Sequence, residues 1–174
     1  YNMYSEIDVD TLLQQKKYDY QTSFFITSWK DTHESNKLSF NGITDRNGRE
    51  KREYFKLMNA LLDTNIIIDN SKIRILRQTI PLYANNYLNY YAMVYNKSTG
   101  WKYGTDVKDY QFEWSLVKCD KYGNYLAVKE LGKGPILALQ IPSNYTYFRL
   151  LLTASNGQTI TTDICKLNSP LKEK

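Results

Sequence analysis

The chain has 174 residues, a formal net charge of +5 and a sequence pI of about 9.0. This length allows one ordinary domain, or a small domain with a substantial extra segment, and excludes a large multidomain enzyme. Hydrophobic residues make up 42% and charged residues 24%, which is the balance of a folded protein rather than a disordered one. The 16 tyrosines and three tryptophans favour β-strands and also suit stacking surfaces.

The charge distribution argues against a nucleic acid as partner, although the chain is basic. A nucleic-acid footprint gathers Lys and Arg on one face, whereas the dense basic cluster over residues 46–56 also contains Glu50 and Glu53. No stretch approaches the roughly 20 apolar residues that cross a bilayer, and the first residues lack a signal-peptide pattern. We therefore expect neither nucleic acid nor membrane. Because the sequence begins at Tyr1, we expect a mature product, a trimmed chain or a fragment.

The cysteines and the histidine give no metal site. Cys119 and Cys165 lie far apart, each in a predicted strand. They are either two buried packing residues or one disulfide. His33 is the only histidine, so no Cys/His zinc set can be written. We expect no structural metal and no cofactor.

The first part of the chain has a helix, strand and helix pattern. Residues 5–18 begin like a capping box and continue with apolar residues at helical spacing. Residues 22–29 predict a strand whose consecutive apolar residues indicate burial on both faces, as in a parallel sheet. A polar loop over 30–37 and a turn over 45–48 follow, with Gly48 at positive φ. Residues 49–62 predict a second helix with one apolar stripe: Tyr54, Leu57, Met58, Leu61 and Leu62.

From residue 65 onward the apolar residues alternate, as in half-buried strands. We expect seven strands, over 72–76, 88–95, 110–119, 126–129, 136–141, 147–154 and 159–167. This pattern predicts an immunoglobulin-like β-sandwich. Phe112 and Trp114 fall on the inward side of their strand, and Tyr147 is a candidate corner tyrosine. Asn156-Gly157 is the strongest hairpin signal in the chain.

One phrase of the sequence resembles a known family. Residues 42–54 read GITDRNGREKREY and follow a predicted strand that ends in Trp29. The phrase resembles the turn and helix after the eighth strand of TIM-barrel glycoside hydrolases of the large retaining clan. Many such enzymes carry a C-terminal Ig-like domain. The implied organisation is mainly β: a short α/β segment in residues 1–64, which resembles the end of a (β/α)8 barrel with its helix, eighth strand and eighth helix, precedes an Ig-like sandwich in residues 65–174.

This resemblance implies the C-terminal portion of a glycoside hydrolase, whose partners are carbohydrate and the remainder of the barrel, in a secreted or periplasmic location. Retaining glycosidases need two carboxyl groups about 5–5.5 Å apart, which family members place on the fourth and seventh strands. Neither strand lies in this sequence. We therefore assign no catalytic residue and expect no hydrolysis by the chain alone.

Substrate contacts are implied at the rim of the barrel. Trp29 resembles the tryptophan whose ring packs on the sugar at the cleaved bond, and Asp31, His33 and Glu34 follow it in the rim loop. The alternatives are a core position for Trp29 between sheet and helix, and simple solvation for the polar loop residues.

Two other functions stay open: a non-catalytic carbohydrate-binding module, and an interaction or spacer domain. A binding module requires a row of exposed aromatic rings on one sheet face or at loop tips, and a coplanar exposed set would favour it. Tyr90 and Tyr91 are adjacent in a strand and point to opposite faces, so at least one of them is expected in the core. The candidate rings are Tyr83, Tyr87, Tyr90, Tyr91, Tyr95, Trp101 and Tyr103.

Overall fold

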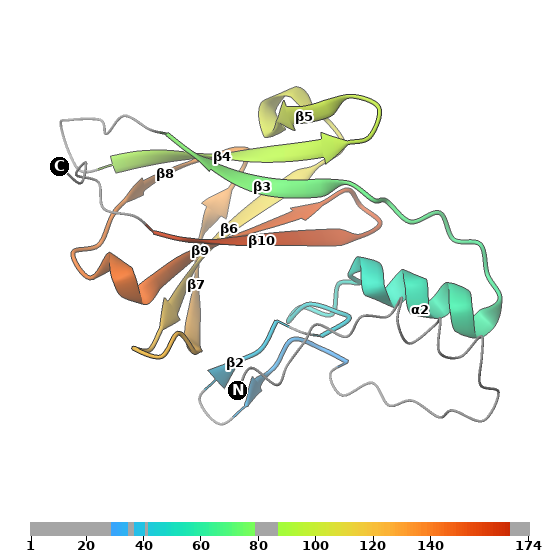
Figure 1. The fold of residues 1–174 in the computed structure, drawn as a ribbon, viewed down its shortest axis with the longest axis horizontal. Coiled ribbons are helices and arrows are strands. Elements are labelled where there is room, and N and C mark those ends of the chain that lie inside the picture. Colours follow the sequence, from blue (N-terminus) through green and yellow to red (C-terminus); the bar gives the residue numbers. More distant parts are fainter. Residues whose placement is uncertain (1–28, 35–36, 41, 79–86, 168–174) are drawn as a thin grey trace.

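A computed structural model describes residues 29–34, 37–40, 42–78 and 87–167 of the chain (Figure 1). The predicted helix over 5–18 and nearly all of the predicted strand over 22–29 lie outside these residues. The described part is mainly β. Its strands form two antiparallel sheets, and the hydrophobic core lies between them. The helix α2, Arg52–Leu62, lies at one end of the sheets.

One sheet has six strands, in the order β1-β2-β7-β6-β9-β10. The other has four, in which β3 pairs with one side of β4, while β5 and β8 share the other side. The strands of the first sheet are β1 His33–Glu34, β2 Lys37–Leu38, β7 Tyr125–Lys133, β6 Gln111–Cys119, β9 Phe148–Ser155 and β10 Ile160–Lys166. Those of the second are β3 Lys72–Arg77, β4 Tyr87–Asn96, β5 Gly100–Tyr103 and β8 Ile136–Gln140.

The inner faces of the two sheets enclose the hydrophobic core. Alternation along β4 turns every second side chain inward, and the inward set consists of Leu88, Tyr90, Ala92 and Val94. Phe112 and Trp114 of β6 face them, with Trp114 only 1% exposed. The indole Nε1 of Trp114 also donates a hydrogen bond to the carbonyl of Gly134, at 2.8 Å. The predicted inward positions of Phe112 and Trp114 are therefore confirmed.

Asp69 joins the helix to the sandwich. It lies in the connection between α2 and β3, and its carboxylate accepts hydrogen bonds from the hydroxyl of Tyr110 and the side-chain amide of Asn156. The carbonyl of Asp69 accepts from the guanidinium of Arg52 in the first turn of α2. Burial disfavours ionisation of Asp69, but these donors and the hydrogen bonds from Ser71 outweigh it and hold the pKa of this carboxyl below its usual value.

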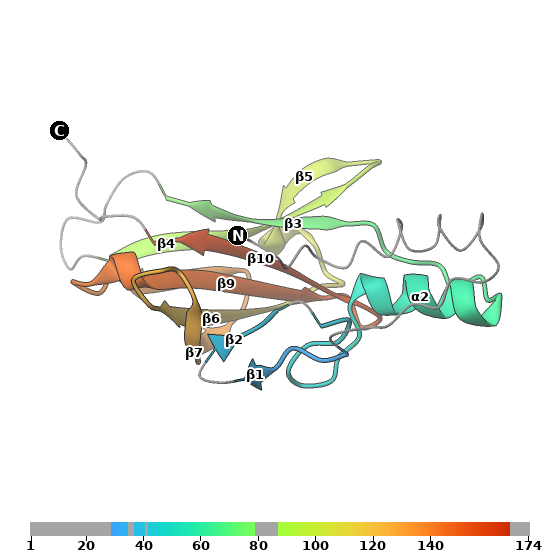
Figure 2. The same ribbon diagram turned by 60° about the horizontal axis from the view of Figure 1, so that its bottom comes forward.

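Residues 29–51 lie against the outer face and edge of the six-stranded sheet (Figure 2). The hairpin β1-β2 extends this sheet through the pair Leu38 and Tyr125, and the backbone of Lys51 forms a parallel bridge to Ile160. The outward side chains beneath this segment are buried: Ser115, Val117, Cys119 and Leu151. The outer face is therefore covered around β6, whereas Thr162 and Ile164 on the outward side of β10 are exposed.

Several predicted boundaries shift because backbone partners lie far away in sequence. The helix begins at Arg52 rather than at residue 49, because the N–H of Lys51 donates to Ile43 and the carbonyl of Glu50 accepts from Ile160. The predicted polar loop over 30–37 contains β1 and the start of β2. Strand β5 was not predicted, and β7 continues past residue 129 to Lys133.

The structure also bears on the predictions for Tyr147, for the two cysteines and for the Asn156-Gly157 hairpin. Tyr147 does not fill a corner position, since it is 44% exposed in the short 3₁₀ turn Tyr145–Tyr147, whereas Tyr145 packs against the core. Cys119 and Cys165 are free thiols, which fits the packing interpretation rather than a disulfide. The predicted Asn156-Gly157 hairpin is confirmed: Gly157 has a φ of 88° between β9 and β10.

Replacing Trp114 with Ala should lower the free energy of unfolding by about 3–5 kcal/mol, because it empties the centre of the core and removes an indole donor. Urea unfolding of the purified variant measures this loss. Tyr122→Ala is the control, since this ring is 79% exposed at the tip of the β6-β7 hairpin. Equal losses for both variants would contradict the assigned core.

Two Tyr→Phe substitutions should differ in their effect on the free energy of unfolding. The hydroxyl of Tyr90 is buried without a hydrogen-bond partner among the described residues, so Tyr90→Phe should leave stability unchanged or raise it. The hydroxyl of Tyr110 donates to the carboxylate of Asp69, so Tyr110→Phe should cost about 1.5–3 kcal/mol. Chemical unfolding of both variants provides the comparison, and a larger loss for Tyr90→Phe would refute it.

Candidate functional site

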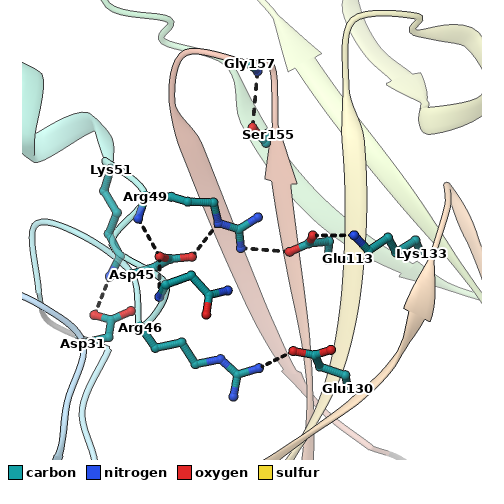
Figure 3. A network of polar contacts seen from close by, with 11 residues as sticks. Asp31, Asp45, Arg46, Arg49, Lys51, Glu113, Glu130, Lys133, Ser155 and Gly157 are labelled. Carbon is teal, nitrogen blue, oxygen red and sulfur yellow. Dashed lines mark hydrogen bonds and ion pairs between the residues drawn. The ribbon is translucent and has the colours of Figure 1, made fainter.

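The turn over residues 45–48 is built by the carboxylate of Asp45. Its Oδ1 accepts the backbone N–H groups of Asn47 and Arg49, both at 2.8 Å, and its Oδ2 accepts from Arg49 Nε at 2.8 Å (Figure 3). The N–H of Gly48 closes the turn by donating to the carbonyl of Asp45, and Gly48 has a φ of 79°, as predicted. Asp45, Gly48 and Arg49 belong to the family-like phrase, which is the sequence over residues 42–54, and they therefore have local structural roles.

Gly42 and Lys51, two further residues of the phrase, enclose Asp31. Asp31 Oδ1 accepts from the N–H of Gly42 at 2.9 Å and from Lys51 Nζ at 2.7 Å. Lys51 Nζ also donates to the carbonyl of Phe40, at 2.8 Å. A side chain at position 42 is excluded, since a Cβ there would lie 2.3 Å from the backbone of Asp31. Burial raises the pKa of Asp31 above its usual value, although Lys51 opposes the shift.

Arg49 connects the turn to the sandwich. Its Nη2 lies 2.8 Å from Glu113 Oε2 of β6, and Glu113 Oε1 lies 3.3 Å from Lys133 Nζ of β7. Burial disfavours the charged form of Glu113, but Arg49 and Lys133 outweigh it and hold the pKa of this carboxyl below its usual value. A second link, from Arg46 to Glu130 at 3.0 Å, is exposed and contributes little.

A cleft of about 300 Å³ lies between this turn and the outer face of the six-stranded sheet. This volume is at the lower end of small-molecule sites. Its charged lining groups, among them Asp45, Arg49, Glu113 and Glu130, are the members of the ion pairs described above. The carboxylates are thus held in structural ion pairs, and we assign them no acid or base role.

Trp29 is exposed, whereas Asp31, the other predicted site residue whose side chain the structure describes, is buried. The ring of Trp29 is 54% exposed and meets the ring of Tyr54 edge-on, with the centroids 6.1 Å apart. Its carbonyl accepts hydrogen bonds from the N–H and the hydroxyl of Thr44, at 3.0 and 3.1 Å. The backbone is therefore fixed and the side chain is half-exposed. The core alternative for Trp29 stays open, because the predicted strand that precedes it lies outside the described residues.

Asp31 lies in a different environment from Trp29. Its carboxylate is 8% exposed and is occupied by Lys51, so it offers little to a ligand at the surface. His33 and Glu34 form β1, opposite Leu38 and Lys37 in the register, and their side chains lie outside the described residues. The partnership of Arg49 with Glu113 was not predicted, because no local pattern marks a partner on a distant strand.

Other kinds of chemistry lack support in the described part of the chain. It contains no group of three or more His, Cys, Asp or Glu side chains that could hold a metal ion. Burial raises the pKa of Cys165 to about 11 and also raises that of Cys119, which disfavours the thiolate form of both. None of the helices among these residues has the length and apolar character to span a membrane.

Comparison of the chain with known protein families, with curated proteins and with solved structures found no match. The functional argument therefore rests on the residues of the chain and their geometry.

Acid should weaken the link between the turn and the sandwich. The pKa of Glu113 is lower in the folded state than its ordinary value of 4.5. The stabilisation is therefore fully present above that value and is lost as the pH falls through the folded-state pKa. We expect the free energy of unfolding to drop in this range, and less steeply for Glu113→Gln.

Chemical unfolding between pH 6 and about pH 3 measures these profiles. Glu130→Gln serves as the matched control, because its ion pair with Arg46 is exposed. Identical pH profiles for wild type and Glu113→Gln would show that the ion pair with Arg49 does not stabilise the fold.

Proposed function

We propose that the chain is the C-terminal portion of a glycoside hydrolase of the TIM-barrel type. Residues 1–64 would complete the barrel, and residues 65–174 would form an Ig-like accessory domain without catalytic residues. One observation carries the proposal: the family-like phrase forms a polar turn that fixes the backbone of Trp29 through Thr44, while the ring faces solvent. Such a ring can pack on the C–H face of a sugar.

The geometry of the phrase supports the resemblance at the level of single residues. Gly42 allows close contact with the chain at Asp31, Gly48 supplies a positive φ, and Lys51 neutralises the buried carboxylate. Each of these positions admits few alternatives. A turn and helix that only shared composition with the family would not need these three residue types together.

The helix α2 offers an apolar surface that a barrel would cover. Of the predicted stripe, Leu57 is buried, but Leu61 and Leu62 are 47% and 60% exposed. Ile67, just beyond the helix, is 86% exposed. Exposed apolar area costs about 25 cal/mol per Å² relative to burial, and barrel helices bury such stripes against the neighbouring strands. The proposed partner for this surface is the remainder of the catalytic domain.

The order of the strands supports an Ig-like accessory domain. When β3, β4, β6, β7, β8, β9 and β10 are taken as successive strands, the first, second and fifth share one sheet. The third, sixth and seventh share the other sheet, with the fourth beside the third. This is the arrangement of strands A, B, E and C′, C, F, G in Ig-like sandwiches, and Trp114 lies on the third strand, where such domains bury a tryptophan.

The catalytic carboxyl pair would belong to the other part of the enzyme. In the described residues Asp31, Asp45 and Glu113 are bound by Lys51 or Arg49. A nucleophile and an acid about 5–5.5 Å apart would have to lie on barrel strands. The substrate is a carbohydrate, and a secreted or periplasmic location goes with that role.

The purified 174-residue chain should hydrolyse no aryl glycoside, whereas the natural polypeptide that contains it should. In that polypeptide, Trp29→Ala should lower kcat/KM by roughly tenfold or more because the sugar loses its stacking surface, and Trp29→Tyr should retain most of the activity. Steady-state kinetics on an aryl-glycoside panel measures both. Tyr122→Ala, at an exposed ring on the far hairpin, is the control.

Two outcomes would contradict the proposal. The first is turnover by the isolated chain that a single carboxylate substitution abolishes. The second is a natural polypeptide that contains this chain but hydrolyses no glycoside at all.

A further inference from the structure

The outer face of the four-stranded sheet gathers five aromatic rings. Because Leu88, Tyr90, Ala92 and Val94 point into the core, the odd-numbered residues of β4 point outward. Trp101 and Tyr103 of β5 lie opposite Tyr95 and Met93 in the register. The aromatic face therefore consists of Tyr87, Tyr91, Tyr95, Trp101 and Tyr103. Tyr90 is the core member of the adjacent pair, and Tyr83 lies outside the described residues.

Three of the five rings of the aromatic face are exposed, and Tyr91 and Tyr95 are half-buried. Tyr87, Trp101 and Tyr103 are 38%, 40% and 45% exposed. Tyr95 and Trp101 are 5.3 Å apart with an angle of 52° between the rings, and Tyr91 and Tyr103 are 5.9 Å apart at 77°. The rings are thus clustered and tilted rather than coplanar. Figure 2 shows β3 and β5 on the side of the molecule away from β1 and β2.

Two cations stand on the same face. Lys72 lies opposite Tyr95 in the register, and Arg74 lies opposite Met93. The guanidinium of Arg74 stacks over Trp101, 4.6 Å from the ring centroid. Neither cation has an ion pair or hydrogen bond among the described residues, and the outward positions of β3, β4, β5 and β8 carry no Asp or Glu. The face is therefore cationic, and stacking orients the donors of Arg74 in advance.

We propose that the aromatic face binds an acidic polysaccharide. Its pyranose rings would pack on the exposed aromatic faces, and Arg74 would bind a uronic-acid carboxylate through two parallel N–H donors, with Lys72 available to a second. Tyr87, Tyr91 and Tyr95 stand four residues apart on one strand, which places successive rings about 14 Å apart over a track of about 27 Å. Such a track suits an extended polymer.

The spacing of charge favours this occupant over a single-stranded nucleic acid. A nucleic acid carries one phosphate per nucleotide and is bound in grooves whose cations follow the backbone. The aromatic face has two cations over its whole length, both near one end of β4. A polysaccharide in which only some sugars carry a free carboxylate, such as a largely methyl-esterified polyuronate, matches that sparse positive charge. The binding requires no barrel, so it can be tested on the chain alone and independently of the proposed hydrolase.

Affinity electrophoresis or calorimetry tests the proposal with polygalacturonate that is largely but not fully methyl-esterified, so that its free carboxylates are far apart; this polymer is called polygalacturonate below. Fully methyl-esterified polygalacturonate is the uncharged counterpart, and oligo(dT) represents nucleic acid. Trp101→Ala and Arg74→Gln alter the face. Tyr122→Ala and Lys121→Gln are matched controls, because Lys121 stacks over Tyr122 at 4.9 Å on a different hairpin. Melting temperatures confirm that all four variants are folded.

We expect the wild-type chain to bind polygalacturonate, and Trp101→Ala and Arg74→Gln each to weaken binding by about tenfold. The control variants should bind as the wild type does, and methyl-esterification should weaken binding. The proposal is overturned if the wild type does not bind polygalacturonate, if the face variants bind equally well, if the esterified polymer binds as tightly, or if oligo(dT) binds more tightly.

Discussion

Arg49 holds the two parts of the described structure together. It is shared by Asp45, which builds the turn, and by Glu113, which belongs to the sandwich. A guanidinium suits this position because its planar array of donors can serve two carboxylates at once, whereas a lysine ammonium is a point charge. Without the Arg49 guanidinium, Asp45 would keep only its backbone donors and Glu113 only the exposed Lys133, and nothing would join the two carboxylates. Together with the bridge from Lys51 to Ile160 and the pair Leu38 and Tyr125, this contact holds the turn against the six-stranded sheet.

The two sheets have opposite environments on their outer faces. The described residues between 29 and 51 lie beside the outer face of the six-stranded sheet, where outward side chains of β6 such as Val117 and Cys119 are buried. The outer face of the four-stranded sheet instead carries half-exposed rings and unpaired cations. A sandwich needs only its inner faces to fold. The segment on the outer face of the six-stranded sheet can connect it to another part of a protein, whereas the open outer face of the four-stranded sheet is available to a ligand.

The two proposals concern separate surfaces. Trp29 stands beside the first turn of α2, where a barrel would meet it, and the aromatic face belongs to β4 and β5 on the other sheet. A hydrolase with an accessory sandwich gains from both, since a second binding surface raises the local concentration of a polymeric substrate. Either proposal can fail without affecting the other, because they share no residue.

The sequence by itself determined the features that depend on neighbours in the chain. Alternation located the main strands and the inward position of Trp114, and the glycines at 48 and 157 marked turns, because both signals are local. Tertiary structure alone decided the start of α2, the short strands β1, β2 and β5, and the burial of Asp31 with Lys51. For the helix start, for β2 and for Asp31 the deciding partner is Ile160, an edge of β7 or the charge of Lys51, which only the folded chain brings into contact. The strands β1 and β5 pair with neighbours in the chain, but they are too short for alternation to mark them.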